Sequence, residues 1–278
     1  SLILSSLLGW NIYWTNLFMG GLLIIYTLSG GARAVAYTQQ LQFAIILLSM
    51  FLAGYLLVHL MPEQVGFVDA LDISGKLGKL NVITDGMTAK GFNWGDNYNI
   101  WSGIIGGFFL ALSYFGTDQS QVGRFLTGKS VRESRLGLLM NGLVKIPMQF
   151  LILLVGALLF SYYSFERAPL IFNQVQEERI QRSVYRDSFQ LAQVRYDSFQ
   201  SIKRRVATEY VQAGGQGSVQ ASVLIPKLQQ AQTEADAVRK QVKGWLNDRV
   251  PGGDGNDTNY IFIRFVLDHL PAGLVGLL

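Results

Sequence analysis

The chain has 278 residues, of which 50% are hydrophobic and 15% are charged, and it contains no cysteine. Soluble domains carry about 25% charged residues, so this composition excludes an ordinary soluble protein and predicts a membrane protein with one polar insert. The net charge of +4 comes from scattered basic residues, so we expect no nucleic-acid partner.

Apolar stretches along the chain predict an all-α, multi-pass membrane protein. Both ends are apolar, which indicates a piece of a longer protein that begins and stops inside membrane helices. The predicted segments are the end of a preceding helix at 1–8, transmembrane helices at 13–30 and 34–60, a polar loop at 61–98, a broken transmembrane helix at 99–126, a transmembrane helix at 131–162, a polar insert at 163–258 and the start of a further transmembrane helix at 259–278.

Basic residues indicate which loops face the cytoplasm. Arg33 lies in the first Gly-Gly turn. Four more basic residues follow the broken helix: Arg124, Lys129, Arg132 and Arg135. Because short cytoplasmic loops are enriched in Lys and Arg, we expect these turns inside the cell. Alternation across the cytoplasmic membrane then puts 61–98 and 163–258 on the extracytoplasmic side.

The broken helix carries a polar run where a membrane helix should still be apolar. The apolar stretch from Ile100 leads directly into Gly116, Thr117, Asp118 and Gln119. A lipid-facing helix cannot carry such a run, because its polar groups would have no partner. Either the helix ends at the preceding Tyr114 and a wet loop follows, or Gly116 breaks it and its polar half lines a cavity. Gly-interrupted segments are typical of transporter binding sites, which favours the cavity.

Lys145 lies well inside the predicted helix 131–162. A lysine at mid-membrane costs about 2.5–3.5 kcal/mol, so it nearly always faces the bundle interior and has a partner. Asn141 and Gln149 lie four residues to either side, so the three side chains share one helix face beside Pro147. One interpretation of this face is a structural tie from Lys145 to Asp118 or to a backbone carbonyl.

The polar insert has apolar residues at helical spacing on both sides of Gly214–Gly217, which predicts a helical hairpin. It ends in PGGDGND at Pro251–Asp257. This sequence lacks the ligand spacing and the closing Glu of a calcium loop, so we expect a flexible linker instead. His59 and His269 have no ligand cluster nearby in sequence, and we expect both to be interfacial residues.

Three stretches make the chain resemble the sodium:solute symporter family. They are YTLSGGARAVAYTQQLQ at Tyr26–Gln42, SYFGTDQSQVGRFLTGKS at Ser113–Ser130 and LPAGLVGLL at Leu270–Leu278. The resemblance implies the middle portion of an inverted-repeat transporter bundle with an extracytoplasmic helical insert. It also implies a small organic solute as partner and Na⁺ as coupling ion, with the main sodium ligands outside this chain.

The resemblance also implies roles for single residues. Tyr114 and Phe115 resemble the aromatic pair that closes over the solute, and Lys145 matches a lysine that reaches the solute in the family's sugar carriers. The candidate solute-site residues are therefore Tyr114, Phe115, Lys145, Gln149 and Asn141. The polar residues of the broken helix are Thr117, Asp118 and Gln119, of which Asp118 either holds a cation, pairs with Arg124 or is a solvated turn charge.

Gln39 and Gln42 are the candidate residues of the ion path. Gln39 stands where the family often has Asp, so it can offer a carbonyl oxygen to an ion but no charge. Gly123 stands where the family commonly has Gln before Arg, and Ala111 is apolar where the sugar carriers can offer an amide. Together these departures weaken a sugar assignment.

These features predict a symporter that moves a small organic solute with sodium across the lipid bilayer by alternating access. The alternative is a transporter-like membrane sensor or scaffold whose working part is the external insert. The sequence contains no visible nucleophile–base pair or metal constellation, so we expect that the protein is not an enzyme.

Overall fold

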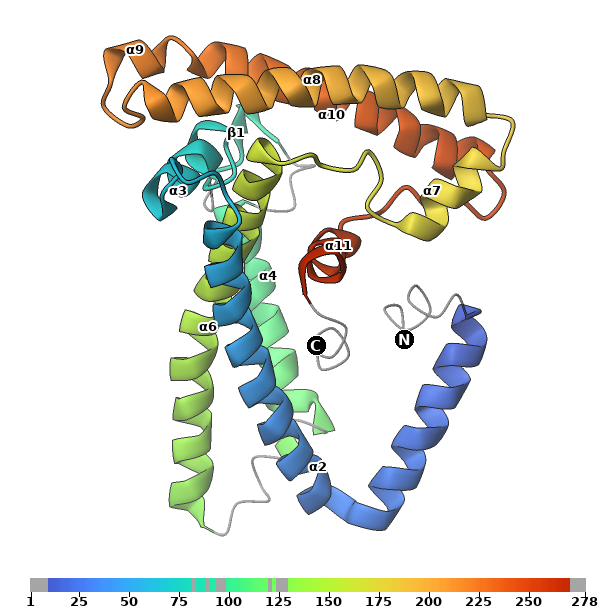
Figure 1. The fold of residues 1–278 in the computed structure, drawn as a ribbon. Helices are drawn as coiled ribbons and strands as arrows, with labels where there is room; N and C mark the ends of the chain where they lie inside the picture. The colour runs from blue at the N-terminus through green and yellow to red at the C-terminus, as the bar shows by residue number, and fades with distance from the viewer. Residues whose placement is uncertain are drawn as a thin grey trace. The chain divides into compact units, whose positions relative to one another are not determined.

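The computed structural model describes residues 10–81, 84–88, 91–93, 99–119, 122–123 and 130–270, without the side chains of 32–34. The predicted helix end at 1–8, the motif residues 271–278, Arg124 and Lys129 lie outside the described residues. Contacts divide the chain into two compact units, one of 1–77 with 154–278 and one of 78–153. Each unit is described by itself, and Figure 1 gives the element labels.

Four helical stretches are long and apolar enough to cross a membrane: Ile12–Gly31, Val35–His59, Ile100–Thr117 and Val131–Phe165. This confirms the predicted all-α, multi-pass architecture. In the most apolar 18-residue stretch of each helix, only 0% to 22% is buried by the rest of the chain. Apolar helices with so little cover require lipid or further helices around them.

The first two spans form one helix with a sharp bend, α2 (Ile12–His59). The bend is at Gly31, whose φ of 59° and ψ of −166° are open to glycine and costly for other residues. Across the bend, the Tyr26 hydroxyl lies 3.1 Å from the Thr38 hydroxyl. The predicted Gly-Gly turn is therefore a helical kink at its second glycine.

The polar loop after α2 contains a helix that was not predicted, α3 (Phe67–Lys76). Its buried Ser74 donates a hydrogen bond to the Ala157 carbonyl of α6 (Val131–Phe165) at 2.7 Å, and Ser161 of α6 donates to the Ala70 carbonyl in return. These reciprocal bonds dock α3 on the last turns of α6, within one hydrophobic core.

The unit formed by 78–153 begins with a small β-hairpin. Strands β1 (Met87–Thr88) and β2 (Gly91–Phe92) pair antiparallel. Helix α4 (Ile100–Leu112) follows and is capped by Asn99, whose side chain accepts the Ser102 N–H at 2.9 Å. The first part of α6 belongs to the same unit.

The polar insert is a helical hairpin, as the spacing of its apolar residues predicts. Its helices are α7 (Gln174–Gln181), α8 (Arg186–Gln212), the short α9 (Val219–Ser222) and α10 (Ile225–Arg249). Helices α8 and α10 lie side by side along most of their length (Figure 1). Buried apolar side chains on the facing sides hold them together, including Phe189, Val206, Leu228 and Val242.

The end of the insert is anchored, in contrast to the flexible linker that we expected. Asp257 is 1% exposed and accepts the Phe172 N–H at 3.0 Å. It also forms ion pairs with Arg239 at 2.7 Å and with Lys243 at 2.6 Å. Burial would raise the pKa of the Asp257 carboxyl, but the two cations and the N–H donor hold this pKa below its ordinary value.

Helix α11 (Tyr260–His269) follows the insert. It ends at Leu270, whose extended backbone (φ −99°, ψ 144°) is usual for the residue before a proline. The start of the further transmembrane helix predicted at 259–278 is thus a separate ten-residue helix in the described part of the chain.

Candidate functional site

The helix that leads to the candidate site ends in a π-helical turn, η1 (Ser113–Thr117). The Asp118 N–H donates to the Ser113 carbonyl at 3.0 Å, which is the i→i+5 bond of a π-helix. Asp118 then leaves helical geometry with φ −73° and ψ 102°. The helix therefore breaks two residues after Gly116, and the alternative in which it ends at Tyr114 is wrong.

The π-turn carries the predicted aromatic pair. The rings of Tyr114 and Phe115 are 5.0 Å apart and nearly perpendicular. The Thr117 hydroxyl bonds back to the Ser113 carbonyl, Asp118 is half-buried and Gln119 is exposed. Such turns often occur at functional sites. The apolar pattern of the sequence contained no signal for the π-turn, because a single wider turn leaves that pattern unchanged.

Lys145 meets Tyr114 from the neighbouring helix α6. Its Nζ atom lies 5.1 Å from the centroid of the Tyr114 ring, within the range of a cation–π interaction. No acidic side chain of the described residues pairs with Lys145, so the predicted tie to Asp118 is not found there. Two candidate residues from separate helices are thus in direct contact.

This contact alone does not offset the cost of a lysine inside the membrane. At about 1.5 Å per residue, Lys145 lies about 21 Å along α6 from its start at Val131. Insertion at mid-membrane costs about 2.5–3.5 kcal/mol, whereas a cation–π contact contributes about 0.5–2 kcal/mol. The Lys145 ammonium therefore needs a further polar partner, such as a solute or another helix.

The face of α6 around Lys145 is polar, as predicted. Asn141 is half-buried, Gln149 is exposed, and neither side chain forms a hydrogen bond within the described part of the chain. Pro147 lies inside α6 and has no N–H, so the Leu143 carbonyl cannot accept its usual helical bond. This stretch offers amide and ammonium groups to a ligand.

The two candidate ion-path residues lie on α2. Gln39 and Gln42 are one helical turn apart, and both side chains are exposed. They belong to the other compact unit, so their role beside Tyr114 and Lys145 stays a prediction.

His269 has partners that the sequence did not indicate. Its Nδ1 lies 2.9 Å from the Phe265 carbonyl, and its Nε2 lies 2.8 Å from the Tyr162 hydroxyl. A carbonyl can only accept, so Nδ1 carries a proton and donates to Phe265, and Nε2 shares a hydrogen bond with the Tyr162 hydroxyl. No local pattern could reveal this pair, because its members lie on opposite sides of the insert.

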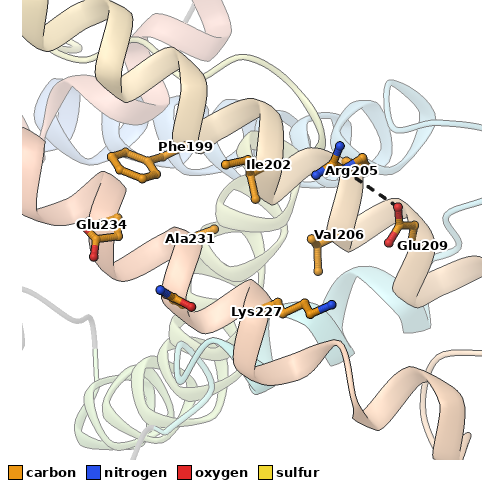
Figure 2. Close-up of a pocket in the computed structure, with 9 residues that line it drawn as sticks. Phe199, Ile202, Arg205, Val206, Glu209, Lys227, Ala231 and Glu234 are labelled. Atoms are coloured by element: carbon orange, nitrogen blue, oxygen red, sulfur yellow. Dashed lines mark ion pairs between the residues drawn. The ribbon is translucent and has the colours of Figure 1, made fainter.

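The insert carries an open groove between α8 and α10, with a volume of about 370 Å³ (Figure 2). Phe199, Ile202 and Val206 are among its apolar residues, and an ion pair between Arg205 and Glu209 lies at one side. Charged residues of both signs beside apolar ones are typical of the surface of two packed helices. The groove brings no reactive groups together. Within the described residues, no group of three His, Asp or Glu side chains could hold a metal ion.

Comparison with protein families matches residues 1–182 to the sodium:solute symporter family. Over 171 residues, the chain is 30% identical to sodium/glucose cotransporter 1 of Sus scrofa, covering 56% of this chain and 25% of that protein. It is 28% identical over 190 residues to the sodium-dependent multivitamin transporter of Oryctolagus cuniculus, covering 66% and 28%. It is 25% identical over 178 residues to the sodium/iodide cotransporter of Homo sapiens, covering 63% and 26%. The chain thus spans about a quarter of the length of these relatives, and no solved structure matches it.

Proposed function

Because the chain belongs to the sodium:solute symporter family, we propose that it is the middle part of a protein that moves a small organic solute with Na⁺ across the cytoplasmic membrane. Members of this family are transporters and not enzymes. Two of these relatives are named as sodium cotransporters, for glucose and for iodide, and the third is named as a sodium-dependent multivitamin transporter. Similarity to these relatives therefore supports sodium coupling but does not favour any one solute.

The contact between Lys145 and Tyr114 carries the proposal for the solute site. The ammonium lies 5.1 Å from the ring centroid and has no ion-pair partner among the described residues. A solute hydroxyl or carboxylate would accept from this ammonium, while the Tyr114 ring would stack on the solute and exclude water. Phe115, Asn141 and Gln149 would complete the lining of the site.

The proposed mechanism is alternating access. Sodium binding would stabilise the outward-open state, and the solute would then bind and draw Tyr114 over the site. Thr117, Asp118 and Gln119 follow directly at the helix break, so closure would move their polar groups with the aromatic pair. Gln39 and Gln42 would assist the ion toward the cytoplasm, and the insert would lie on the extracytoplasmic side.

The test is uptake of a solute library by the full-length protein in proteoliposomes, with and without a sodium gradient. We expect sodium-dependent uptake that falls at least about tenfold in Lys145→Ala, since a hydrogen bond to a charged group is worth about 1.5–3 kcal/mol. Lys227→Ala, at the groove of the insert, is the matched control and should keep normal uptake.

Two results would contradict parts of this proposal. Uptake that survives Lys145→Ala would give Lys145 a structural role only. Solute binding without accumulation of any solute would favour the sensor or scaffold.

A further inference from the structure

A polar pocket of about 290 Å³ lies where the end of α6, the insert and α11 meet, within one compact unit. Its polar side chains come from five separate segments and include Tyr163, Arg167, Glu177, Gln193, Arg264 and Asp268. None of these residues belongs to the proposed solute site around Tyr114 and Lys145. Pockets of this size suit a small molecule of a few heavy atoms.

The Tyr163 hydroxyl is the first sign that the pocket takes a ligand. Tyr163 is 7% exposed, and its hydroxyl has no hydrogen-bond partner in the described part of the chain. Buried hydroxyl groups nearly always have a partner, so an unpaired one on a residue that lines a pocket indicates a missing polar group.

Glu177 and Arg264 are oppositely charged, and each has hydrogen-bonding atoms that no described residue uses. Glu177 is half-buried and forms no hydrogen bond or ion pair with any described residue. Burial raises the pKa of its carboxyl, and Arg264 works to lower it. Within the described residues, Arg264 donates only through its Nε, to Asp268 at 2.9 Å. Its two Nη groups are therefore available to donate to a ligand.

The other charges of the pocket are already satisfied. Arg167 donates to both carboxylate oxygens of Asp197, at 2.6 and 3.3 Å, and Gln193 donates to the same carboxylate at 3.0 Å. Arg264 has an ion-pair partner in Asp268, but its Nη donors are unused, and Glu177 has no partner among the described residues. These two groups therefore decide which ligand fits.

We propose that this pocket binds a small zwitterion of the amino-acid class. The ligand carboxylate would accept from the Nη groups of Arg264 and from the Tyr163 hydroxyl, and its ammonium would donate to Glu177. A simple carboxylate would face Glu177 as a like charge, and a simple amine would leave the Nη donors of Arg264 without an acceptor. An uncharged polyol would fit the volume but would not neutralise the charge of Glu177.

The test is calorimetric binding to the full-length protein in lipid nanodiscs, in a Lys145→Ala background that disables the proposed solute site. Four probes separate the ligand classes: L-alanine, propionate, ethylamine and glycerol. We expect L-alanine to bind, and the other three to bind at least about tenfold more weakly. Glycerol or ethylamine binding as tightly as L-alanine would overturn the assignment of a zwitterion.

Two substitutions test the residues. Glu177→Gln should weaken L-alanine binding about tenfold or more, and Tyr163→Phe should weaken it severalfold. The matched control is Glu178→Gln, because Glu178 is exposed, pairs with Arg182 at 3.1 Å and does not line the pocket. Equal effects of Glu177→Gln and Glu178→Gln, or no effect of Glu177→Gln, would overturn the site.

Thermal stability separates lost binding from lost folding. Because burial disfavours the charged form of Glu177, Glu177→Gln should keep or raise the melting temperature of the ligand-free protein while it weakens binding. A lower melting temperature with normal binding would assign Glu177 a structural role and contradict the proposal.

Discussion

Lys145 and Asp257 differ in how completely their charges are partnered within the described residues. Asp257 has two cations and a backbone N–H around it. Lys145 has the face of one aromatic ring and no acidic partner among the described residues. The charge of Asp257 is thus satisfied within the insert, whereas that of Lys145 is satisfied only in part. A complete set of partners indicates a structural role, and an incomplete set indicates a ligand.

Replacing Asp257 tests the structural role. Asp257→Ala leaves Arg239 and Lys243 without their shared carboxylate, and removing one member of a buried ion pair costs about 3–5 kcal/mol. Because both cations are partly exposed, we expect Asp257→Ala to lower the free energy of unfolding of the insert by about 2–4 kcal/mol. Hydrogen exchange of α10 amides in the full-length protein should rise accordingly, whereas exposed Asp248→Ala should change little. Equal exchange in the two variants would contradict the anchor.

The same carboxylate predicts a pH dependence. The folded-state pKa of Asp257 is lowered, so its contribution is fully present above the ordinary carboxyl pKa of about 3.9 and is lost as pH falls through the lower folded-state value. The difference in α10 protection between the native protein and Asp257→Asn should be constant above about pH 5 and shrink below about pH 4. A difference that grows on acidification would have the wrong sign.

At the scale of elements, the bend in α2 allows one continuous helix to supply two membrane spans. A straight α-helix of 48 residues would be about 72 Å long, against a hydrocarbon core of about 30 Å. Gly31 reverses the direction with a backbone conformation that only glycine adopts at low cost. The Tyr26–Thr38 hydroxyl contact then lies across the bend.

Gly31→Ala should therefore weaken the bend. A side chain in this backbone region costs about 1–3 kcal/mol, so we expect lower yields of folded protein and a wider distance distribution between spin labels at positions 24 and 48. Gly20→Ala is the matched control, since a Cβ there meets nothing within 4 Å. Identical distance distributions for the two variants would show that Gly31 is not the hinge.

Local sequence patterns predicted the elements that are determined by residues close together in the chain. Ser29-Gly30-Gly31 marked the bend, and the apolar spacing on both sides of Gly214 marked the hairpin. The break after Tyr114 was predicted, but at Gly116, because glycine was the visible helix breaker; the π-turn moves it to Asp118. Helix α3 was missed because it is short and lies in a polar segment, and its docking depends on Ser161 far along the chain.

At the scale of the whole molecule, the charge distribution predicts a topology that can be measured. The basic turns predict a cytoplasmic position for residue 132 and an extracytoplasmic position for the insert. Val184 is 93% exposed, so a single cysteine placed there should react with a membrane-impermeant maleimide on intact cells. A cysteine at position 132 should react only after permeabilisation, and the reverse pattern would invert the topology.

The candidate site was predictable only where a local sequence pattern marked its residues. Lys145 and Asn141 share a helix face that the sequence displays directly, and Tyr114 stood out beside the polar run. The resemblance assigned Tyr114 and Lys145 to the solute site, but their contact was not predicted, since two separate helices bring them together. The contacts of His269 with Tyr162 and of Asp257 with Phe172 followed from neither pattern nor resemblance, because their members are 107 and 85 residues apart.

The most direct test of the central claim is a double-mutant cycle on solute affinity in the presence of Na⁺. The claim is that Tyr114 and Lys145 act on the solute as one unit. Calorimetry would compare the native protein, Tyr114→Leu, Lys145→Met and the double variant, with a solute identified by uptake. We predict a coupling energy of about 0.5–2 kcal/mol, so that the double variant loses less affinity than the sum of the single losses. Losses that add within about 0.3 kcal/mol would show that the two residues act independently and would contradict the account.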